Sequence, residues 1–177
     1  MSDLDWFVYE TTRIRRVVQT YLELFIDKHS VETLTNTASE VFAIIQRSMH
    51  DEILISLSRL YEGKEQLSQY SLVSKYKEVL TDSLEELKLQ TGELFEKLDL
   101  KDYRNSKVAH NSREVYPFNG KIIKHSIDSE ILISLLETSQ KLIIGIKLEL
   151  GKNSLPVMIN EKYEGKGSKL VQKLCEI

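Results

Sequence analysis

A chain of 177 residues, 41% hydrophobic and 29% charged, is long enough to bury a core, and this composition argues against wholesale disorder. The formal net charge of −3 argues against a protein that holds nucleic acid by bulk charge. The single cysteine excludes a disulfide framework or a thiolate zinc site. Two prolines and seven glycines are few for this length and favour long helices over a β fold with many turns.

The start of the chain and its apolar runs indicate a cytoplasmic protein. Residues 1–5 are acidic where an export signal is basic. The longest apolar runs, near residues 131–136 and 142–146, fall well short of the roughly 18–20 residues that a membrane span needs. We therefore expect a cytoplasmic location and no membrane partner.

Two long helices are predicted in the first third of the chain, where apolar residues recur three and four positions apart. The first begins at residue 2 or 3 and ends near residue 28. The second begins between residues 30 and 36 and ends at residues 62–63, where a glycine is a natural stop. The predicted core stripe of the second helix is Val41, Ile44, Ile45, Met49, Ile53, Leu57 and Leu60.

A short helix is expected over about residues 71–80, followed by a longer one that opens at Thr81 or Asp82. One or two further helical turns hold residues 104–110. The pair Asn119-Gly120 then predicts a small β-hairpin at residues 116–123, because Asn-Gly is the preferred type I′ turn.

The C-terminal third is predicted to hold one more long helix, capped by Asp128 and running from Ser129 to about Leu150, with Gly151 as its end. A short helix from Ser168 is expected after an extended piece. The expected fold is all-α, a bundle of four long helices with short helices and the small hairpin. We expect one domain over residues 1–152 and a C-terminal extension over residues 153–177.

One segment carries candidate chemistry, namely Arg104 and His110 with five residues between them. An imidazole titrates near neutrality and can remove a proton and return it. A guanidinium stays charged and grips phosphate oxygens through a planar fork. Together they suffice for RNA cleavage without a metal, in which a 2′-hydroxyl attacks the adjacent phosphate.

The spacing alone is weak support, because an arginine followed by a histidine at this interval arises easily by chance. On a straight helix the two side chains also stand some 120° apart. A two-fold partner would relieve this, since segments from two subunits could bring Arg104 and His110 together. The small residues Ser106 and Ala109 would permit that close approach.

The context of this segment strengthens the prediction. Arg104, Asn105 and His110 match the signature of the HEPN family of helical nucleotide- and RNA-binding domains, which this chain resembles from about Trp6 to Leu150. The AbiU-type subgroup, named for a bacterial abortive-infection protein, is the most similar. That likeness is carried by residues 41–45, 49–54, 57–60, 70–72 and 107–112.

The resemblance implies a metal-independent endoribonuclease, in a homodimer with its site at the interface and with no cofactor. By the same resemblance Arg104 and His110 are catalytic and Asn105 assists. The expected substrate is single-stranded RNA rather than DNA, in a toxin or phage-defence setting. Some members of the family are toxins controlled by antitoxins, so a cognate antitoxin stays open as a partner, and others bind RNA or nucleotides without cutting.

Three further residues are candidate substrate contacts. Lys107 could touch a phosphate, and Tyr103 could stack on an unpaired base. Asp51 could support the site from the second helix, or could pair with Arg47 one turn away. No metal site is expected at His50-Asp51-Glu52, because adjacent helical residues point in different directions.

Each candidate also has an ordinary structural interpretation. Arg104 could form a surface ion pair with Asp99 or Asp102, and His110 could simply end a helix. Asn105 could be a cap or turn residue. Two alternatives to the nuclease follow: a silent helical module that binds RNA, a nucleotide or a partner protein, and a plain dimerisation domain whose motif is covered by the tail.

Overall fold

The computed structural model describes residues 2–62, 66–98, 100, 128–152 and 166–176, and helices are the only regular secondary structure in this part of the chain. Four long helices are present, as predicted, with two short α-helices and one 3₁₀ helix. They are α1 (Asp3–Phe25), α2 (Lys28–Tyr61), α3 (Gln69–Lys75), η1 (Lys77–Val79), α4 (Asp82–Lys97), α6 (Ser129–Glu149) and α7 (Lys166–Cys175). The predicted hairpin at residues 116–123 lies outside the described residues.

Side-chain caps set the helix boundaries. The Ser2 hydroxyl accepts from the Asp5 N–H at 3.2 Å, and the Asp5 carboxylate accepts from the Ser2 N–H in return, which completes a capping box for α1. Asp128 accepts from the first N–H groups of α6, as predicted. At the other end of α6, Gly151 adopts a φ of +65°, which is a left-handed conformation that glycine takes without strain.

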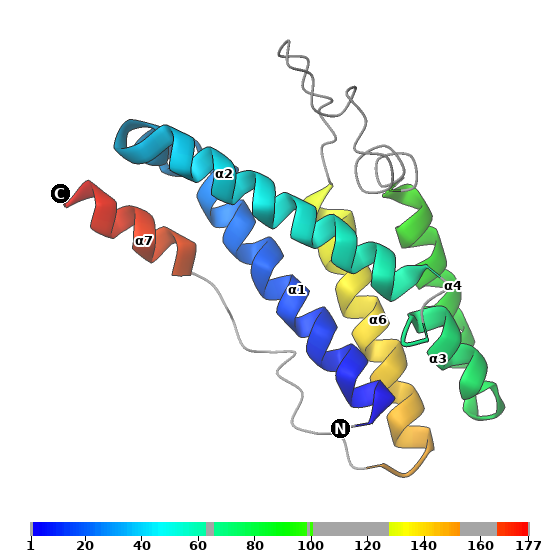
Figure 1. Ribbon diagram of the computed structural model, residues 1–177. Coiled ribbons are helices and arrows are strands. Elements are labelled where there is room, and N and C mark those ends of the chain that lie inside the picture. The colour runs from blue at the N-terminus through cyan, green and yellow to red at the C-terminus, as the bar shows by residue number, and fades with distance from the viewer. Residues whose placement is uncertain (1, 63–65, 99, 101–127, 153–165, 177) are drawn as a thin grey trace.

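Helix α1 is the centre of the bundle and packs against α2, α6 and α7, while α4 lies along α6 (Figure 1). The core between these helices is mostly leucine and isoleucine. Its fully buried members include Leu4, Phe7, Ile14, Ile53, Leu57, Leu60, Leu135, Leu136, Leu142, Ile143 and Ile146.

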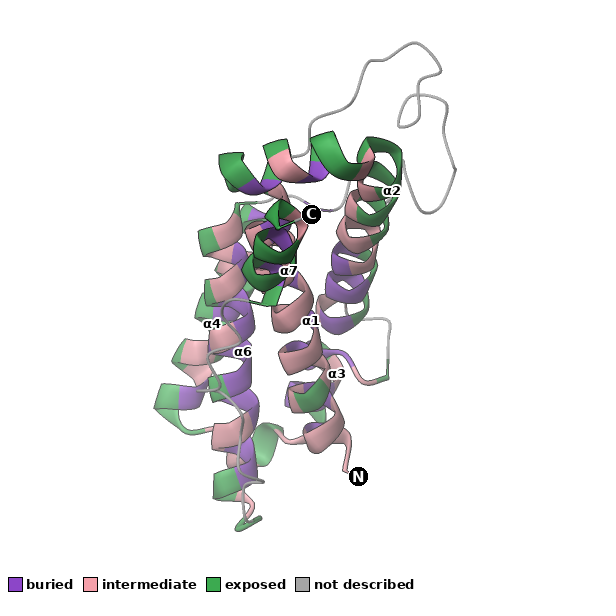
Figure 2. Ribbon diagram, turned by 90° about the vertical axis from the view of Figure 1, so that its left-hand side faces the viewer, coloured by how far each residue is buried: buried purple, intermediate pink, exposed green. Residues whose placement is uncertain are grey.

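Helix α2 is bent at Ala38, whose φ of −160° and ψ of 69° interrupt the helical backbone. Its first part therefore lies across the end of the bundle, at an angle to its second part (Figure 2). Of the core stripe predicted for this helix, Ile53, Leu57 and Leu60 are buried. The prediction is wrong for Val41, Ile44 and Ile45, which are exposed because the helices packed on this part of α2 cover its opposite side.

Polar side chains join α1 to α6 inside the bundle. The Gln140 amide donates to the Thr11 and Thr12 hydroxyls at 3.0 and 2.9 Å. Two turns further along α6, the Lys147 ammonium donates to Asp5 at 2.5 Å, with only 4% of the lysine side chain exposed. Because buried polar groups are costly unless they are paired, these contacts fix the register of α6 against α1.

Two helical glycines give a matched test of the packing between α4 and α6. A Cβ on Gly145 of α6 would lie 2.3 Å from Leu84 Cδ2 in the core, whereas one on Gly92 of α4 would meet nothing within 4 Å. Gly145→Ala is therefore expected to lower the free energy of unfolding by about 1–2 kcal/mol through overpacking. Gly92→Ala is expected to raise it by roughly 0.5–1 kcal/mol through helix propensity. Urea denaturation of both variants checks the pair, and equal shifts of the same sign would contradict this packing.

The C-terminal helix α7 is docked by a small second core. Val171 is buried among Leu24 and Leu34, and Phe42 and Leu174 pack beside them. The Glu23 carboxylate of α1 accepts from the N–H groups of Gly167 and Ser168, at 2.8 and 3.3 Å. These contacts hold the start of α7 against α1 and fix the orientation of α7 about its own axis.

Candidate functional site

The motif residues Tyr103, Arg104, Asn105, Lys107 and His110 lie outside the described residues. The structure does describe the residues that precede and follow this segment in the chain. Leu98, the C-cap of α4, and Leu100, just after it, are buried in the core, and Asp128 caps α6. These two helices are neighbours, and the ends that flank residues 101–127 lie at the same end of the bundle (Figure 1). The described residues that precede and follow the candidate segment therefore lie at one end of the α4–α6 pair.

Asp51, the sixth predicted site residue, is described and lies on α2 next to His50. Its Oδ1 atom is 3.8 Å from His50 Nδ1, and 29% of its side chain is exposed. The His50 ring is mostly buried and packs on Tyr21 of α1, with ring centroids 6.2 Å apart. An imidazole held between two helices beside a carboxylate resembles a proton-transfer group. The sequence alone did not single out His50 for this, because its position depends on how α1 meets α2.

Two arginines of α1, Arg13 and Arg15, form ion pairs with neighbouring helices. The Arg13 guanidinium binds Glu52 of α2 at 2.7 Å, and also contacts Glu10 and Ser56. Burial alone would lower the pKa of Arg13, but the hydrogen bonds to Glu52 and Glu10 outweigh it and raise that pKa. Arg15 binds Glu137 of α6 at 2.7 Å. These two cations are therefore already occupied and do not supply a phosphate site.

A hollow of about 670 Å³ lies between α3, η1 and α4. Its wall includes Tyr70 and Leu89, whose side chains are largely exposed although aromatic or apolar. Its charged lining consists of three glutamates and two lysines, with one ion pair between Glu85 and Lys88. An excess of negative charge does not suit a phosphate backbone, so this hollow is better fitted to a protein surface than to RNA.

The described part of the chain offers no metal centre. No three His, Cys, Asp or Glu side chains within it are placed to hold an ion together. None of its helices is long and apolar enough to cross a membrane.

The described helices form a bundle, and the candidate segment connects two neighbouring helices, α4 and α6, in the sequence. This arrangement is the class of helical domain that the motif predicts. A family model for HEPN AbiU2 matches residues 7–165. The chain belongs to this family, so the resemblance read from its sequence is confirmed. The match includes the whole segment from Tyr103 to His110 and ends just before α7. It therefore extends past Leu150, where the resemblance was expected to end.

Neither the curated proteins nor the solved structures contain a significant match to this chain.

Proposed function

We propose that the protein is a metal-independent endoribonuclease of the bacterial defence or toxin type, acting on single-stranded RNA in the cytoplasm. The observation that carries the proposal is membership of the AbiU2 family over a match that contains Arg104 and His110 at HEPN spacing. Because AbiU-type proteins are named for abortive infection, the setting would be phage defence, with a cognate antitoxin as a partner.

In the proposed reaction, His110 takes the proton from a ribose 2′-hydroxyl, whose oxygen attacks the adjacent phosphorus. Arg104 stabilises the negative charge that develops on the phosphate oxygens, and Asn105 assists by hydrogen bonding. The bond from phosphorus to the 5′-oxygen breaks, and that oxygen leaves with a proton from the acid form of His110. The products are a 2′,3′-cyclic phosphate and a 5′-hydroxyl, so neither metal nor water enters this step.

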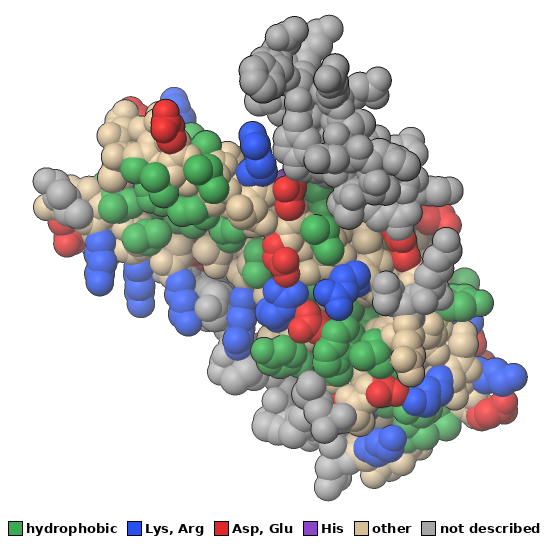
Figure 3. Space-filling view, in the orientation of Figure 1, with side chains coloured by type: hydrophobic (Ala, Val, Ile, Leu, Met, Phe, Trp, Pro, Cys, Tyr) green, Lys and Arg blue, Asp and Glu red, His purple; other side chains and the backbone are tan. Residues whose placement is uncertain are grey.

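A homodimer is part of the proposal, and an apolar face on α2 supports it. Val41 and Ile44 are 55% and 67% exposed, and Ile45 and Ile55 are also exposed on this helix. Hydrophobic side chains gather over α2 in the space-filling view (Figure 3). Exposed apolar patches of this kind typically mark protein interfaces. A second copy with the same face on a two-fold axis could also supply the missing half of an Arg104–His110 pair.

The α2 face is tested by a charge at its centre. Ile44→Glu is expected to convert the dimer into a monomer, because a buried unpaired carboxylate at an interface is strongly unfavourable. Analytical ultracentrifugation measures the change in mass. Leu89→Glu is the matched control, since Leu89 is as exposed as Ile44 but lies on α4 at the hollow. If wild type and both variants sediment alike, α2 is not the dimer interface.

The nuclease itself is tested with a labelled single-stranded RNA of mixed sequence and the purified full chain. Cleavage should be the same in EDTA and in magnesium, and the 3′ ends should be 2′,3′-cyclic phosphates. Loss of cleavage in EDTA would contradict the mechanism. Complete inactivity at high enzyme concentration would contradict the catalytic function.

The second candidate function is a non-catalytic module that binds RNA, a nucleotide or a partner protein. The hollow between α3 and α4 favours a protein partner within this alternative, because Tyr70 and Leu89 are exposed beside glutamates. An inactive protein whose partner binding is lost in Leu89→Glu would support it.

A further inference from the structure

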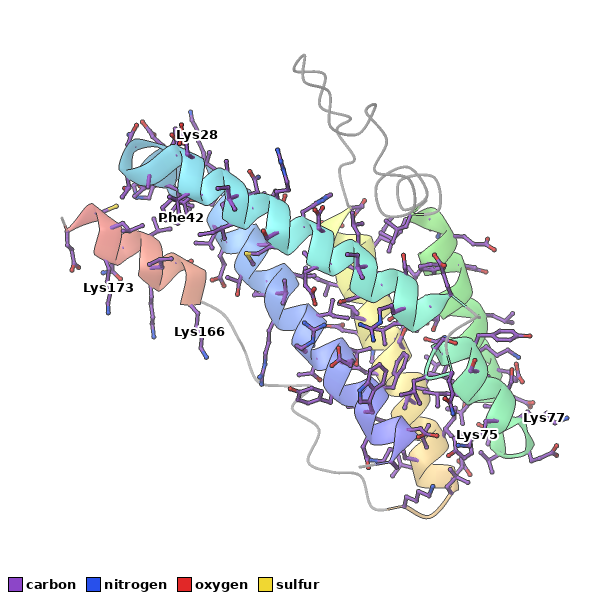
Figure 4. All side chains as sticks on the ribbon, viewed as in Figure 1. Lys28, Phe42, Lys75, Lys77, Lys166 and Lys173 are labelled. Atoms are coloured by element: carbon purple, nitrogen blue, oxygen red, sulfur yellow. The ribbon has the colours of Figure 1, made fainter. Side chains whose placement is uncertain are left out.

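A row of lysines follows one face of α7. Lys166, Lys169 and Lys173 are all exposed, and their spacing of three and four residues places them within an arc of about 60° on the helix. At about 1.5 Å per residue, the row spans roughly 10 Å along the helix axis. Figure 4 shows Lys166 and Lys173 pointing in the same direction, away from α2, and Figure 3 shows the basic side chains as a line along this edge.

The direction of this row is fixed by how α7 is docked. Val171 and Leu174 pack on α1 and α2 on the opposite side of the helix, and Phe42 lies between α2 and α7 (Figure 4). A Cβ on Gly167 would lie 2.9 Å from the Cβ of Glu23, so the two helices touch closely at this point. Because α7 cannot rotate about its axis without losing these contacts, the lysines are held facing outward.

Several basic side chains of the described helices are held in ion pairs, whereas two lysines of the row are not. Arg13, Arg15, Lys75 and Lys147 each bind a carboxylate within 3 Å. Neither Lys169 nor Lys173 forms an ion pair with any described residue, and the neighbouring lysines repel each other. In a chain of net charge −3, a fixed row of like charges is therefore a local basic surface on an acidic protein.

We propose that Lys166, Lys169 and Lys173 bind the phosphate backbone of the RNA substrate outside the catalytic motif. This inference rests on the proposed ribonuclease function and adds a second contact surface to it. Lysines set along a line suit a polyanionic strand, whose charges also repeat along a line. An anionic membrane fits less well, because the apolar face of α7 is already buried and three lysines fall short of the clusters that bind lipid headgroups.

The test compares two triple variants with the same change in net charge. Lys166, Lys169 and Lys173 are changed to glutamine in one, and Lys28, Lys141 and Lys152, which are exposed elsewhere, in the other. Binding of a fluorescent single-stranded RNA is followed by anisotropy from low to high salt. The α7 variant is expected to bind roughly tenfold or more weakly, and its log–log salt slope is expected to fall by about 2, at about 0.7 per lost phosphate contact. The control should match wild type.

A third variant with arginine at the three α7 positions keeps the charge and should keep the affinity. Circular dichroism confirms that each variant is folded. If wild type binds and cuts RNA while both glutamine variants keep the same affinity and slope, the α7 surface is overturned and the ribonuclease stands. If wild type neither binds nor cuts RNA, the proposed function fails and this inference fails with it. Equal weakening in both glutamine variants would mean that only net charge matters, which also overturns it.

Discussion

His110→Ala is expected to reduce the rate of RNA cleavage by roughly 10²–10⁴-fold, the range usually lost with a general acid–base group. The proposed histidine acts twice in one turnover, first on the 2′-hydroxyl and then on the leaving 5′-oxygen, so alanine removes both steps. RNA binding should change little, because the positive charges that hold the backbone are untouched. Initial rates at saturating RNA, with cyclic-phosphate ends as the readout, measure the loss.

His125→Ala is the matched control, since it removes another histidine from the same segment of chain and should leave the rate unchanged. Equal activity of wild type and both variants would remove His110 from the mechanism. Arg104→Lys keeps the charge but loses the planar fork, so a lowered rate there would separate geometry from charge.

Mixing two inactive variants asks whether the site is shared between subunits. If Arg104 of one chain works with His110 of the other, a dimer of Arg104→Ala with His110→Ala contains one intact pair. Random exchange should then recover about one quarter of the wild-type activity, from one site in half of the dimers. No recovery after demonstrated subunit exchange would place both residues of each site in one chain.

Asp5→Asn is expected to lower the free energy of unfolding by about 3 kcal/mol, because it leaves the Lys147 ammonium buried without its partner. Urea denaturation of this variant, of Lys147→Met and of the double variant completes a mutant cycle. The double variant should recover most of the loss, since an apolar side chain of similar volume then fills the lysine site. Strictly additive losses would mean that the two residues act independently.

The same pair predicts a response to acid. The hydrogen bond from Lys147, followed by that from Ser2, lowers the pKa of Asp5 from 3.8 to about 2. A carboxyl whose pKa is lower in the folded state contributes its full stability above pH 4 and loses it as the pH falls through about 2. Stability should therefore fall less between pH 4 and 2 in Lys147→Met than in wild type.

The helices of this fold could be predicted from local signals in the sequence. Ser2, Asp128 and Gly151 mark helix ends by chemistry that depends on neighbouring residues only, and the structure confirms them. The bend at Ala38 could not be predicted, because alanine is a good helix former and carries no signal for a break.

The error on α2 has a physical reason. Apolar residues at helical spacing show that one face avoids water, and they do not say whether its cover comes from the same chain. In the sequence, Val41, Ile44 and Ile45 continue the apolar stripe of Ile53 and Leu57. In the structure the first three residues are exposed, whereas Ile53 and Leu57 are buried. A proposed second copy would cover the exposed part.

The candidate site also has one part that the sequence could predict and one part that it could not. Arg104 and His110 were found through the family pattern, and the family match confirms the pattern's context but not their roles. The contact between His50 and Tyr21 joins residues far apart in the chain and depends on the packing of two helices. No local pattern in the sequence carries that information.

The central place of α1 has a consequence for the making of the protein. The groups that complete this first helix come late: Gln140 is 129 residues from Thr11, Lys147 is 142 residues from Asp5, and Gly167 is 144 residues from Glu23. At roughly 5–20 residues per second, a ribosome takes on the order of ten seconds to make that intervening chain. During this interval the face of α1 that α6 and α7 cover stays open, and a chain truncated before α6 lacks the contacts that Gln140 and Lys147 make with the first helix.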